Sequence, residues 1–254
     1  MSSTKSVSAA ALAIGDELLS GRTKDKNIGH LAELLTAVGI GLKEVRIVSD
    51  DEDAIVAALN ALRQNYDYVF TSGGIGPTHD DITADSVAKA FGLPCLHDAK
   101  AMEMMGAHYE KRGMEFTEAR KRMARMPQGA EHIDNPVSIA PGFSIENVYV
   151  MAGVPSVFQA MLDNVLPTLR RGRKVISQSI PCPFAEGDIG SPLRLIADSH
   201  QDVSIGSYPR YTDKGYSNEI VVRSADEAAV TRAVLAVQQL LTEMGQSPTK
   251  PNAD

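Results

Sequence analysis

The fold of this chain is decided by the stretch Tyr68-Val-Phe-Thr-Ser-Gly-Gly-Ile-Gly-Pro-Thr-His-Asp-Asp-Ile-Thr83. Its first four residues, 68–71, are predicted to form a strand, and residues 83–91 are predicted to form a helix that Gly92 ends. Between them, three glycines let the backbone turn tightly and approach a ligand closely. The N–H groups of such a turn, and those at the start of the next helix, are suited to bind an anion.

Two carboxylates, Asp80 and Asp81, follow this turn directly. Beside a bound anion they would repel the ligand unless a divalent cation joins them. The loop therefore predicts a phosphate-bearing ligand that binds together with a metal ion. A simpler alternative is that Asp81 or Thr83 only caps the following helix. His79 has no partner in the sequence and is interpreted as a solvated side chain outside the catalytic set.

Strand and helix patterns alternate on both sides of this loop. Such alternation predicts the α/β class with a doubly wound, mostly parallel sheet, in which ligands bind beyond the carboxyl ends of strands. Strands are expected at 7–14, 42–48 and 148–151, and helices at 28–38, after 49–53 and from 153–156. Two helices broken near Gly113 are expected within 98–126, and a loop with a short strand within 135–143.

The pattern changes after Lys174. A β-α-β-β-α order is typical of a small split α/β domain. Its expected elements are a strand at 175–180, a helix at 187–199, strands at 203–208 and 219–223, and a helix at 226–244. We therefore expect a first domain at 7–172, a small C-terminal α/β domain at 173–245 and a disordered tail at 246–254.

Size and charge limit the classes of function. A chain of 254 residues can hold one medium domain and one small one. The net charge of −7 supplies no overall field that would draw nucleic acid or anionic lipid. The only Gly-x-x-Gly of the C-terminal domain, Gly187–Gly190, carries Asp188 where phosphates would need donors. We therefore expect neither a nucleic acid nor a membrane partner.

The cysteines and the N-terminus indicate a compartment. Cys95 and Cys182 are far apart and outside any metal-ligand spacing, which suits a reducing cytoplasm. The apolar residues 7–14 follow Lys5 as a signal-peptide core would, but they run straight into an acidic turn and are interpreted as a buried first strand. No apolar run approaches the roughly 20 residues of a membrane helix. A cytoplasmic protein is expected.

Three further turns carry glycines or acids at strand ends. The first, Gly15-Asp-Glu-Leu-Leu-Ser-Gly21 with Asn27 after it, suits either a metal or polar site or a plain tight turn. Acids in the second, Ser49-Asp-Asp51, are best explained as caps of the next helix. The third, Met151-Ala-Gly-Val-Pro-Ser156, again presents backbone N–H groups to a phosphate. Together with the loop after residue 72, these turns are expected to converge at one edge of the sheet.

Five motifs occur in a recognisable order: Gly15-Asp-Glu-Leu-Leu-x-Gly with Asn27, Ser72-Gly-Gly-Ile-Gly-Pro-Thr-x-Asp-Asp-Ile-Thr, Asn135-Pro, Ala140-Pro-Gly and Gly153-Val-Pro-Ser. Over residues 7–169 the chain resembles the MoaB/Mog molybdopterin-binding domain superfamily. Within it, the likeness is strongest to the N-terminal region of the competence/damage-inducible CinA proteins. The C-terminal part, with Ser204-Ile-Gly-Ser-Tyr-Pro209, looks like the extension after the same domain in eukaryotic FAD synthetase.

The resemblance implies two chemistries at one set of loops. CinA-like members are associated with divalent-metal-dependent nucleotide pyrophosphatase activity on ADP-ribose, FAD or a similar dinucleotide, and this hydrolase activity is the leading expectation. The alternatives are molybdopterin binding or adenylyl transfer in molybdenum-cofactor biosynthesis, and a non-catalytic nucleotide- or pterin-binding module. The metal would be Mg, Mn or Co, and a homo-oligomer, either a dimer or a trimer, is expected.

The resemblance also assigns roles to residues. Asp81 matches the acid of a Gly-Pro-x-x-x-Asp-x-Thr motif, and Asp50 matches the acid after the second strand, which displaces the capping interpretation for that residue. The expected catalytic residues are Asp50 and Asp81, and the expected metal ligands are Asp50, Asp80 and Asp81. The expected phosphate- or ligand-binding residues are Gly15, Asp16, Glu17, Asn27, Ser72, Gly73, Gly74, Gly76, Pro77, Thr78, Gly153, Pro155 and Ser156.

Four positions depart from the family pattern. Ser138 and Ile139 stand where a glycine and a threonine are usual, and Ala152 and Val157 replace a proline and a glutamate. Ser138 adds a side chain and Ile139 removes a hydroxyl group. The phosphate loop itself keeps the pattern, so these departures bear on the choice of ligand.

Overall fold

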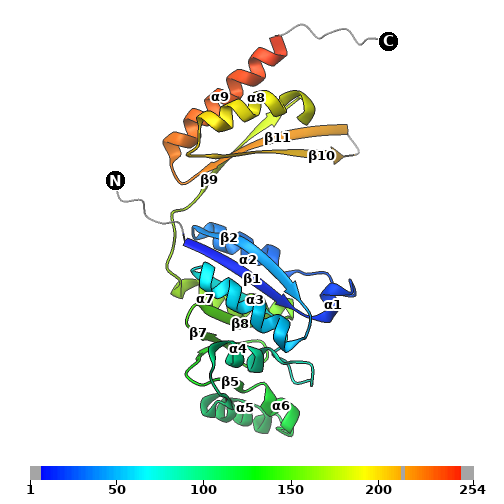
Figure 1. Cartoon of the computed structure of the whole chain (residues 1–254). Coiled ribbons are helices and arrows are strands. Elements are labelled where there is room, and N and C mark those ends of the chain that lie inside the picture. The colour runs from blue at the N-terminus through cyan, green and yellow to red at the C-terminus, as the bar shows by residue number, and fades with distance from the viewer. Residues whose placement is uncertain (1–6, 213–214, 247–254) are drawn as a thin grey trace. The chain divides into compact units, whose positions relative to one another are not determined.

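The structure is a computed structural model that describes residues 7–212 and 215–246. The chain forms two compact units, Met1–Gly172 and Arg173–Asp254, which we call the N-terminal and C-terminal domains (Figure 1). Each is described by itself.

A six-stranded sheet forms the centre of the N-terminal domain (Figure 1). The first three pairings between neighbouring strands are parallel, and the last two pairings are antiparallel. The prediction of a mostly parallel sheet is therefore confirmed. In spatial order the strands are β2 (Ile40–Val48), β1 (Val7–Ile14), β3 (Tyr68–Ser72), β8 (Val148–Met151), β7 (Gly142–Ile145) and β6 (Glu131–Ile133).

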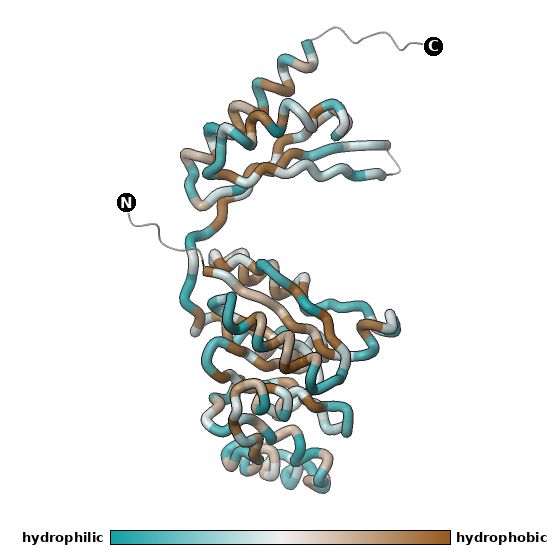
Figure 2. The backbone as a smooth tube through the Cα atoms, in the orientation of Figure 1, coloured by the Kyte–Doolittle hydropathy of each residue, from teal (hydrophilic) through white to brown (hydrophobic). Residues whose placement is uncertain are grey.

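Helices cover both faces of this sheet. On one face lie α2 (Asn27–Ala37) and α7 (Pro155–Val165), whose apolar residues share a core with Ala9, Ala11 and Phe70. On the other face, α3 (Glu52–Asn65), α4 (Thr83–Phe91) and α5 (Ala99–Lys111) pack over Ala10 and Leu12. Figure 2 shows the apolar residues concentrated on the strands and on the inner sides of helices. Because side chains alternate across a strand, β1 is buried on both faces, as expected of a central parallel strand.

Residues 98–126 differ from the prediction. The helices α5 and α6 (Glu118–Arg122) and the break near Gly113 are confirmed, but β5 (Arg125–Pro127) is a strand rather than helix. It pairs antiparallel with β4 (Cys95–His97), and Met126 is buried in the core beside α4. Pairing between two short segments that are distant in sequence outweighed the local helical pattern. Four further elements were not predicted as such: β4, β6, α1 (Asp16–Leu19) and a 3-10 turn at Leu166–Thr168.

The C-terminal domain has the predicted β-α-β-β-α order. Its three strands form an antiparallel sheet in the order β10, β11, β9, and Ile220 and Val222 of the central strand pack against both helices. The elements are β9 (Ile176–Cys182), α8 (Glu186–Ser199), β10 (Ser204–Thr212), β11 (Gly215–Ser224) and α9 (Glu227–Gln246).

The end of α9 corrects the expected tail. Gln246 is the last residue of the helix, and residues 247–254, where the rest of the disordered tail was expected, lie outside the described part of the chain. In the described ranges no helix is both long and apolar enough to cross a membrane.

Candidate functional site

The turn after β3, residues 73–81, is called the glycine loop below. Gly73 and Gly74 have φ angles of 111° and 68°, in the left-handed half of conformational space that glycine adopts without steric cost. A side chain at Gly73 would also collide with the backbone carbonyl of Ile14, at the end of β1. A Cβ atom at Gly153, after β8, would lie only 3.2 Å from the Cα atom of Gly73. Turns after three neighbouring strands therefore pack backbone against backbone, as the convergence of the motifs predicted.

The glycine loop leaves some of its N–H groups free. The Gly73 N–H donates to the Met151 carbonyl (3.1 Å), and the Thr78 N–H donates to Asp81 Oδ2 (2.8 Å). Within the described residues, the N–H groups of Gly74, Ile75 and Gly76 have no hydrogen-bond partner. Of the predicted phosphate-binding amides, these central three are available to a ligand.

Asp81 is turned into the glycine loop. Its Oδ2 accepts hydrogen bonds from the N–H and from the hydroxyl of Thr78, at 2.8 and 2.6 Å. Thr83 donates its hydroxyl to the Gly73 carbonyl (3.0 Å) and its N–H to the Gly74 carbonyl (2.9 Å). Neither side chain caps α4, whose N-cap residue Ile82 makes no such bond, so the capping alternative is wrong. Both side chains instead hold the loop in shape.

Asp51 caps a helix, whereas Asp50 lies at the candidate site. Asp51 is the N-cap of α3 and accepts from the Ala54 N–H at 2.8 Å. Asp50 reaches the first turn, where its Oδ2 accepts from the Asp16 N–H at 3.0 Å. Burial, opposed by that hydrogen bond, raises the pKa of Asp50, and the charges of Glu17, Asp16 and Asp80 raise it further. We call these four residues, Asp16, Glu17, Asp50 and Asp80, the acidic corner.

The remaining loop residues are exposed. His79 is fully exposed, 3.9 Å from Asp80 Oδ1, in agreement with the solvated interpretation. Hydrogen bonding by the Thr78 side chain is the largest of the effects that lower the pKa of Asp80. In the described ranges no three His, Cys, Asp or Glu side chains are grouped closely enough to hold a metal ion. The metal role of Asp50, Asp80 and Asp81 therefore stays a prediction.

Asn27 connects two of the converging turns through its side chain. It is buried at the start of α2, and its Nδ2 donates to Ser72 Oγ and to the Gly153 carbonyl, both at 2.8 Å. Its Oδ1 is buried and has no partner among the described atoms. Asn27 and Ser72 were predicted to bind ligand, but in the structure they position the loops that do face the cavity.

A cavity of about 510 Å³ opens in front of the glycine loop. Of the predicted residues, Glu17, Gly73, Gly74, Gly76, Pro77, Asp81, Gly153 and Pro155 line it. Gly15, Asp16, Asn27, Asp50, Ser72, Thr78, Asp80 and Ser156 do not. Its apolar lining residues are Ile75, Met123, Ala152, Val154, Val157 and Met161. The two altered positions Ala152 and Val157 thus face the cavity directly.

Residues 135–140, the asparagine loop, complete the cavity wall. Asn135 is buried; its Nδ2 donates to Ser138 Oγ (2.6 Å) and the Ala140 carbonyl (2.7 Å), and its Oδ1 accepts from the N–H groups of Val137 and Ser138. Ile139 has a φ angle of 68°, which is rare for a β-branched residue. The unusual Ser138 thus adds a bond within the loop, and Ile139 occupies a conformation that glycine would adopt more easily.

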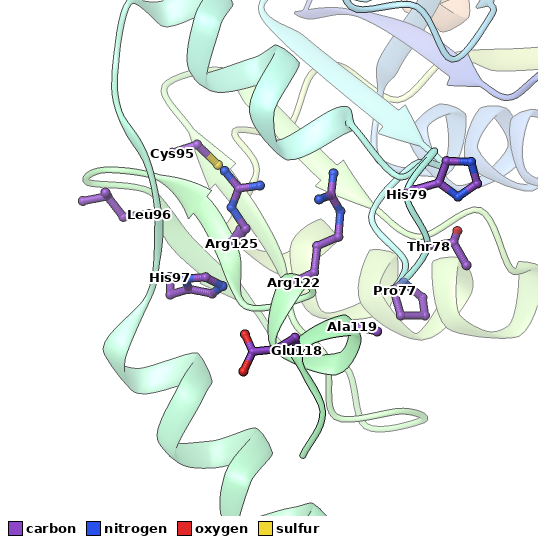
Figure 3. A pocket seen from close by; sticks show the side chains of 10 residues that line it. All are labelled: Pro77, Thr78, His79, Cys95, Leu96, His97, Glu118, Ala119, Arg122 and Arg125. Atoms are coloured by element: carbon purple, nitrogen blue, oxygen red, sulfur yellow. The ribbon is translucent and has the colours of Figure 1, made fainter. Parts of the chain in front are cut away.

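A second cavity, of about 570 Å³, is bordered by residues 77–79 of the glycine loop and was not predicted (Figure 3). Arg122 and Arg125 point into it. Arg122 donates to the Asp81 carbonyl at 3.0 and 3.2 Å, and Arg125 forms a bidentate pair with Asp85 at 2.6 and 2.8 Å. The basic residues in 120–125 were the one sequence feature that could have indicated this cavity. Because the whole segment was predicted to be helical, the strand β5, which brings Arg125 beside α4, was missed.

Comparisons with known proteins show the family of each domain. A family model described as a probable molybdopterin binding domain matches residues 10–171, and one described as the FAD synthase middle domain matches residues 174–249. Protein TK1472 of Thermococcus kodakarensis is 34% identical over 241 residues, which cover 89% of this chain and 94% of that protein. Protein PAE0875 of Pyrobaculum aerophilum is 36% identical over 212 residues, or 78% of each chain.

A solved structure also matches. The structure of CinA from Thermoplasma acidophilum, described as a protein of unknown function, has a TM-score of 0.60 at 32% identity, with 65% of this chain and 99% of that chain covered. This chain therefore belongs to the probable molybdopterin-binding domain family, as a CinA-like protein with a C-terminal domain of the FAD synthase middle-domain type.

Proposed function

We propose that the N-terminal domain hydrolyses the phosphoanhydride of a dinucleotide such as ADP-ribose or FAD, with a divalent metal ion. One observation carries the proposal: three unpartnered N–H groups, those of Gly74, Ile75 and Gly76, lie on a loop that lines the 510 Å³ cavity, with the acidic corner nearby. Free donors suit a polyanion, and carboxylates suit the cation that accompanies it.

The cavity is of the right size class for the rest of such a ligand, because small-molecule sites usually enclose about 300–1,000 Å³. The free N–H groups would bind phosphate oxygens. Asn27 would keep the glycine loop and the Gly153 turn at a fixed separation, since it is bonded to Ser72 and Gly153 at 2.8 Å each. A rigid arrangement of donors avoids reorganisation when charge develops during the reaction.

The acidic residues fit a metal ion in one respect. Asp50 is half-buried among like charges that raise its pKa, so a cation beside it would relieve the repulsion. Asp81 already accepts two hydrogen bonds from Thr78, but a carboxylate has about four acceptor positions and keeps capacity for a cation. Asp50, Asp80 and Asp81 would hold the ion, which when bound would neutralise phosphate charge and lower the pKa of a water molecule.

Pterin binding or adenylyl transfer in molybdenum-cofactor biosynthesis is the second candidate. It is favoured by the family description of residues 10–171 and by the apolar wall of the cavity, which suits a flat ring. In this case a pterin would bind tightly while ADP-ribose and FAD would not be hydrolysed.

A binding module without catalysis is the third candidate. Val157 and Ala152 line the cavity where the family pattern has glutamate and proline, so the wall lacks the polar side chain that the pattern supplies. Binding of nucleotide without turnover under any divalent metal would favour this candidate.

The test uses metal-stripped full-length protein incubated with ADP-ribose, FAD or NAD, with Mg, Mn or Co added separately. AMP release is followed by chromatography. Asp50→Asn is compared with Asp51→Asn, a matched control that keeps a good N-cap residue on α3. Metal-dependent AMP release that Asp50→Asn loses and Asp51→Asn retains would support the proposal. No AMP from any substrate with any metal would contradict it.

A further inference from the structure

Strand β2 lies at one edge of the six-stranded sheet (Figure 1). It is nine residues long, longer than the five or six of an average strand, and in the described part of the chain no strand pairs with its outer side. Val45 and Ile47 are 40% and 43% exposed, although branched apolar side chains on a sheet are normally buried. Within the N-terminal domain, this edge therefore carries an exposed apolar strip, Val45 and Ile47, with no strand paired beside it.

The peptide groups of the strip also lack strand partners. The Gly15 N–H donates to the Val48 carbonyl (3.1 Å), so Val48 faces β1. Backbone groups alternate in direction along a strand, so those of Val45 and Ile47 face away from β1. Soluble proteins usually protect such edges with proline, lysine or a bulge. The register shift opposite Ala9 and Ala10 falls at Lys43, and the residues after it, 44–48, contain neither proline nor lysine.

We propose that β2 pairs antiparallel with β2 of a second copy of this chain, about a twofold axis through Val45. This register brings Glu44 opposite Arg46 of the partner subunit, twice across the axis, and brings the two Val45 side chains together. Opposite charges in facing positions stabilise a strand pair, and like charges destabilise it. A register centred on Glu44 or on Arg46 would instead place identical charges opposite each other.

The two charged residues are already held in place for this pairing. Glu44 accepts from the Tyr66 hydroxyl and from Arg46 Nε, both at 2.7 Å. These bonds keep Glu44 ionised by holding its pKa below the ordinary value. Because both side chains are ordered within one subunit, less conformational entropy is lost when two strands pair.

The pairing leaves the candidate site of each subunit complete. Asp50 is five positions from the axis, so two copies of it would be roughly 33 Å apart along the strand direction at 3.3 Å per residue. The proposed interface is therefore independent of the proposed hydrolysis. A monomeric variant that still releases AMP would separate the two proposals.

Sedimentation velocity of the full chain over a wide range of concentration tests the pairing. The wild-type chain is expected to form a dimer. Val45→Lys would place two ammonium groups at the axis, where like charges repel each other, and should weaken the dimer at least about a hundredfold. Leu235→Lys on α9, at a position that is 60% exposed, is the matched control and should leave the dimer unchanged. A monomeric wild type, or a dimer that Val45→Lys does not weaken, would overturn the proposal.

A charge exchange tests the register. Arg46→Glu should weaken the dimer because it faces Glu44 of the partner subunit, and adding Glu44→Arg should restore it. A double variant that is folded by circular dichroism but fails to dimerise would refute this register. If Val45→Lys or the exchanged chains do not fold, Val45→Cys replaces them: oxidation should link two chains through the substituted positions, as peptide mapping would show. Absence of that link would refute the pairing.

Discussion

Two loops that line the same cavity differ in whether their backbone N–H groups have hydrogen-bond partners. The glycine loop leaves the N–H groups of Gly74, Ile75 and Gly76 without partners in the described part of the chain. In the asparagine loop, Asn135 alone donates two hydrogen bonds and accepts two from within the loop. An unpaired polar group is costly once water is excluded, so the free N–H groups of the first loop favour a ligand, whereas the second loop satisfies the N–H groups of Val137, Ser138 and Ile139 internally. We therefore call the glycine loop the binding side of the proposed site, and the asparagine loop its frame.

The loops also differ in how they reach a left-handed conformation. The glycine loop uses Gly73 and Gly74, whereas the asparagine loop places Ile139 at a φ angle of 68°. For a residue with a side chain this conformation costs about 1–2 kcal/mol. Ile139 packs against the core, and its N–H donates to the Asn135 carbonyl at 3.1 Å. Packing and hydrogen bonds in the asparagine loop thus offset the strain of the positive φ angle at Ile139. The glycine loop avoids this strain because its residues with positive φ angles are glycines.

Of the substitutions considered, the replacement of Gly73 should have the largest effect on stability and activity. Gly73→Ala adds a side chain at a φ angle of 111° that collides with the Ile14 carbonyl. Strain and overpacking together should lower the free energy of unfolding by about 3–5 kcal/mol and abolish AMP release. Gly92→Ala is the control, because that glycine also has positive φ but open space around it. It should cost about 1 kcal/mol in urea unfolding. Equal costs for both variants would mean that the close approach of the turns is unimportant.

Asp50→Asn should change activity and stability in opposite directions. AMP release should fall about a hundredfold, by analogy with the loss of one electrostatic donor. Metal-free protein should nevertheless become more stable at neutral pH. Because the pKa of Asp50 is raised in the folded state, its ionisation favours unfolding as pH rises, and the amide removes this effect. The gain in unfolding free energy should disappear below the ordinary pKa of 3.8, where the carboxyl is protonated in both states. A lower melting temperature for the variant at neutral pH would contradict the proposed environment of Asp50.

Asn135→Ala should damage the frame and leave the donors of the binding side in place. The variant loses four hydrogen bonds inside a buried loop, which should cost about 2–4 kcal/mol of unfolding free energy. The Michaelis constant should rise more than the turnover number falls, since the wall of the cavity moves while the glycine loop stays. Asn164→Ala, which removes one exposed bond to the Asp134 carbonyl, is the control. A loss of turnover as large as that of Asp50→Asn would erase the distinction between the loops.

Ser138→Ala should have the smallest effect. Asn135 Nδ2 would lose the Ser138 hydroxyl but keep the Ala140 carbonyl, so the expected cost is about 1 kcal/mol or less. Thermal unfolding measures this cost, and AMP release should stay close to wild type. A strong change in substrate preference would show that Ser138 contacts the ligand and that the frame takes part in recognition.

Much of this molecule follows from the sequence by itself. The bounds of β1, α4 and β8 agree with the predicted ranges, because apolar periodicity and glycine punctuation act within a few neighbouring residues. The mostly parallel sheet, the β-α-β-β-α domain and the convergence of glycine-rich turns at strand ends follow from the same local signals. The resemblance of the ordered motifs to one family was also available at this level.

Only the tertiary structure decided which of the converging groups are free. Gly73 is bonded to Met151 and Thr78 to Asp81, while Asn27 reaches across to Gly153. These partners, apart from Thr78 and Asp81, are far apart in the sequence, and no local pattern encodes them. The raised pKa of Asp50, the strand β5 and the position of β2 at the edge of the sheet likewise depend on contacts between distant residues. The sequence determines which residues stand at strand ends. Hydrogen bonding and burial depend on contacts between residues that are distant in the sequence, and those contacts exist only once the chain has folded.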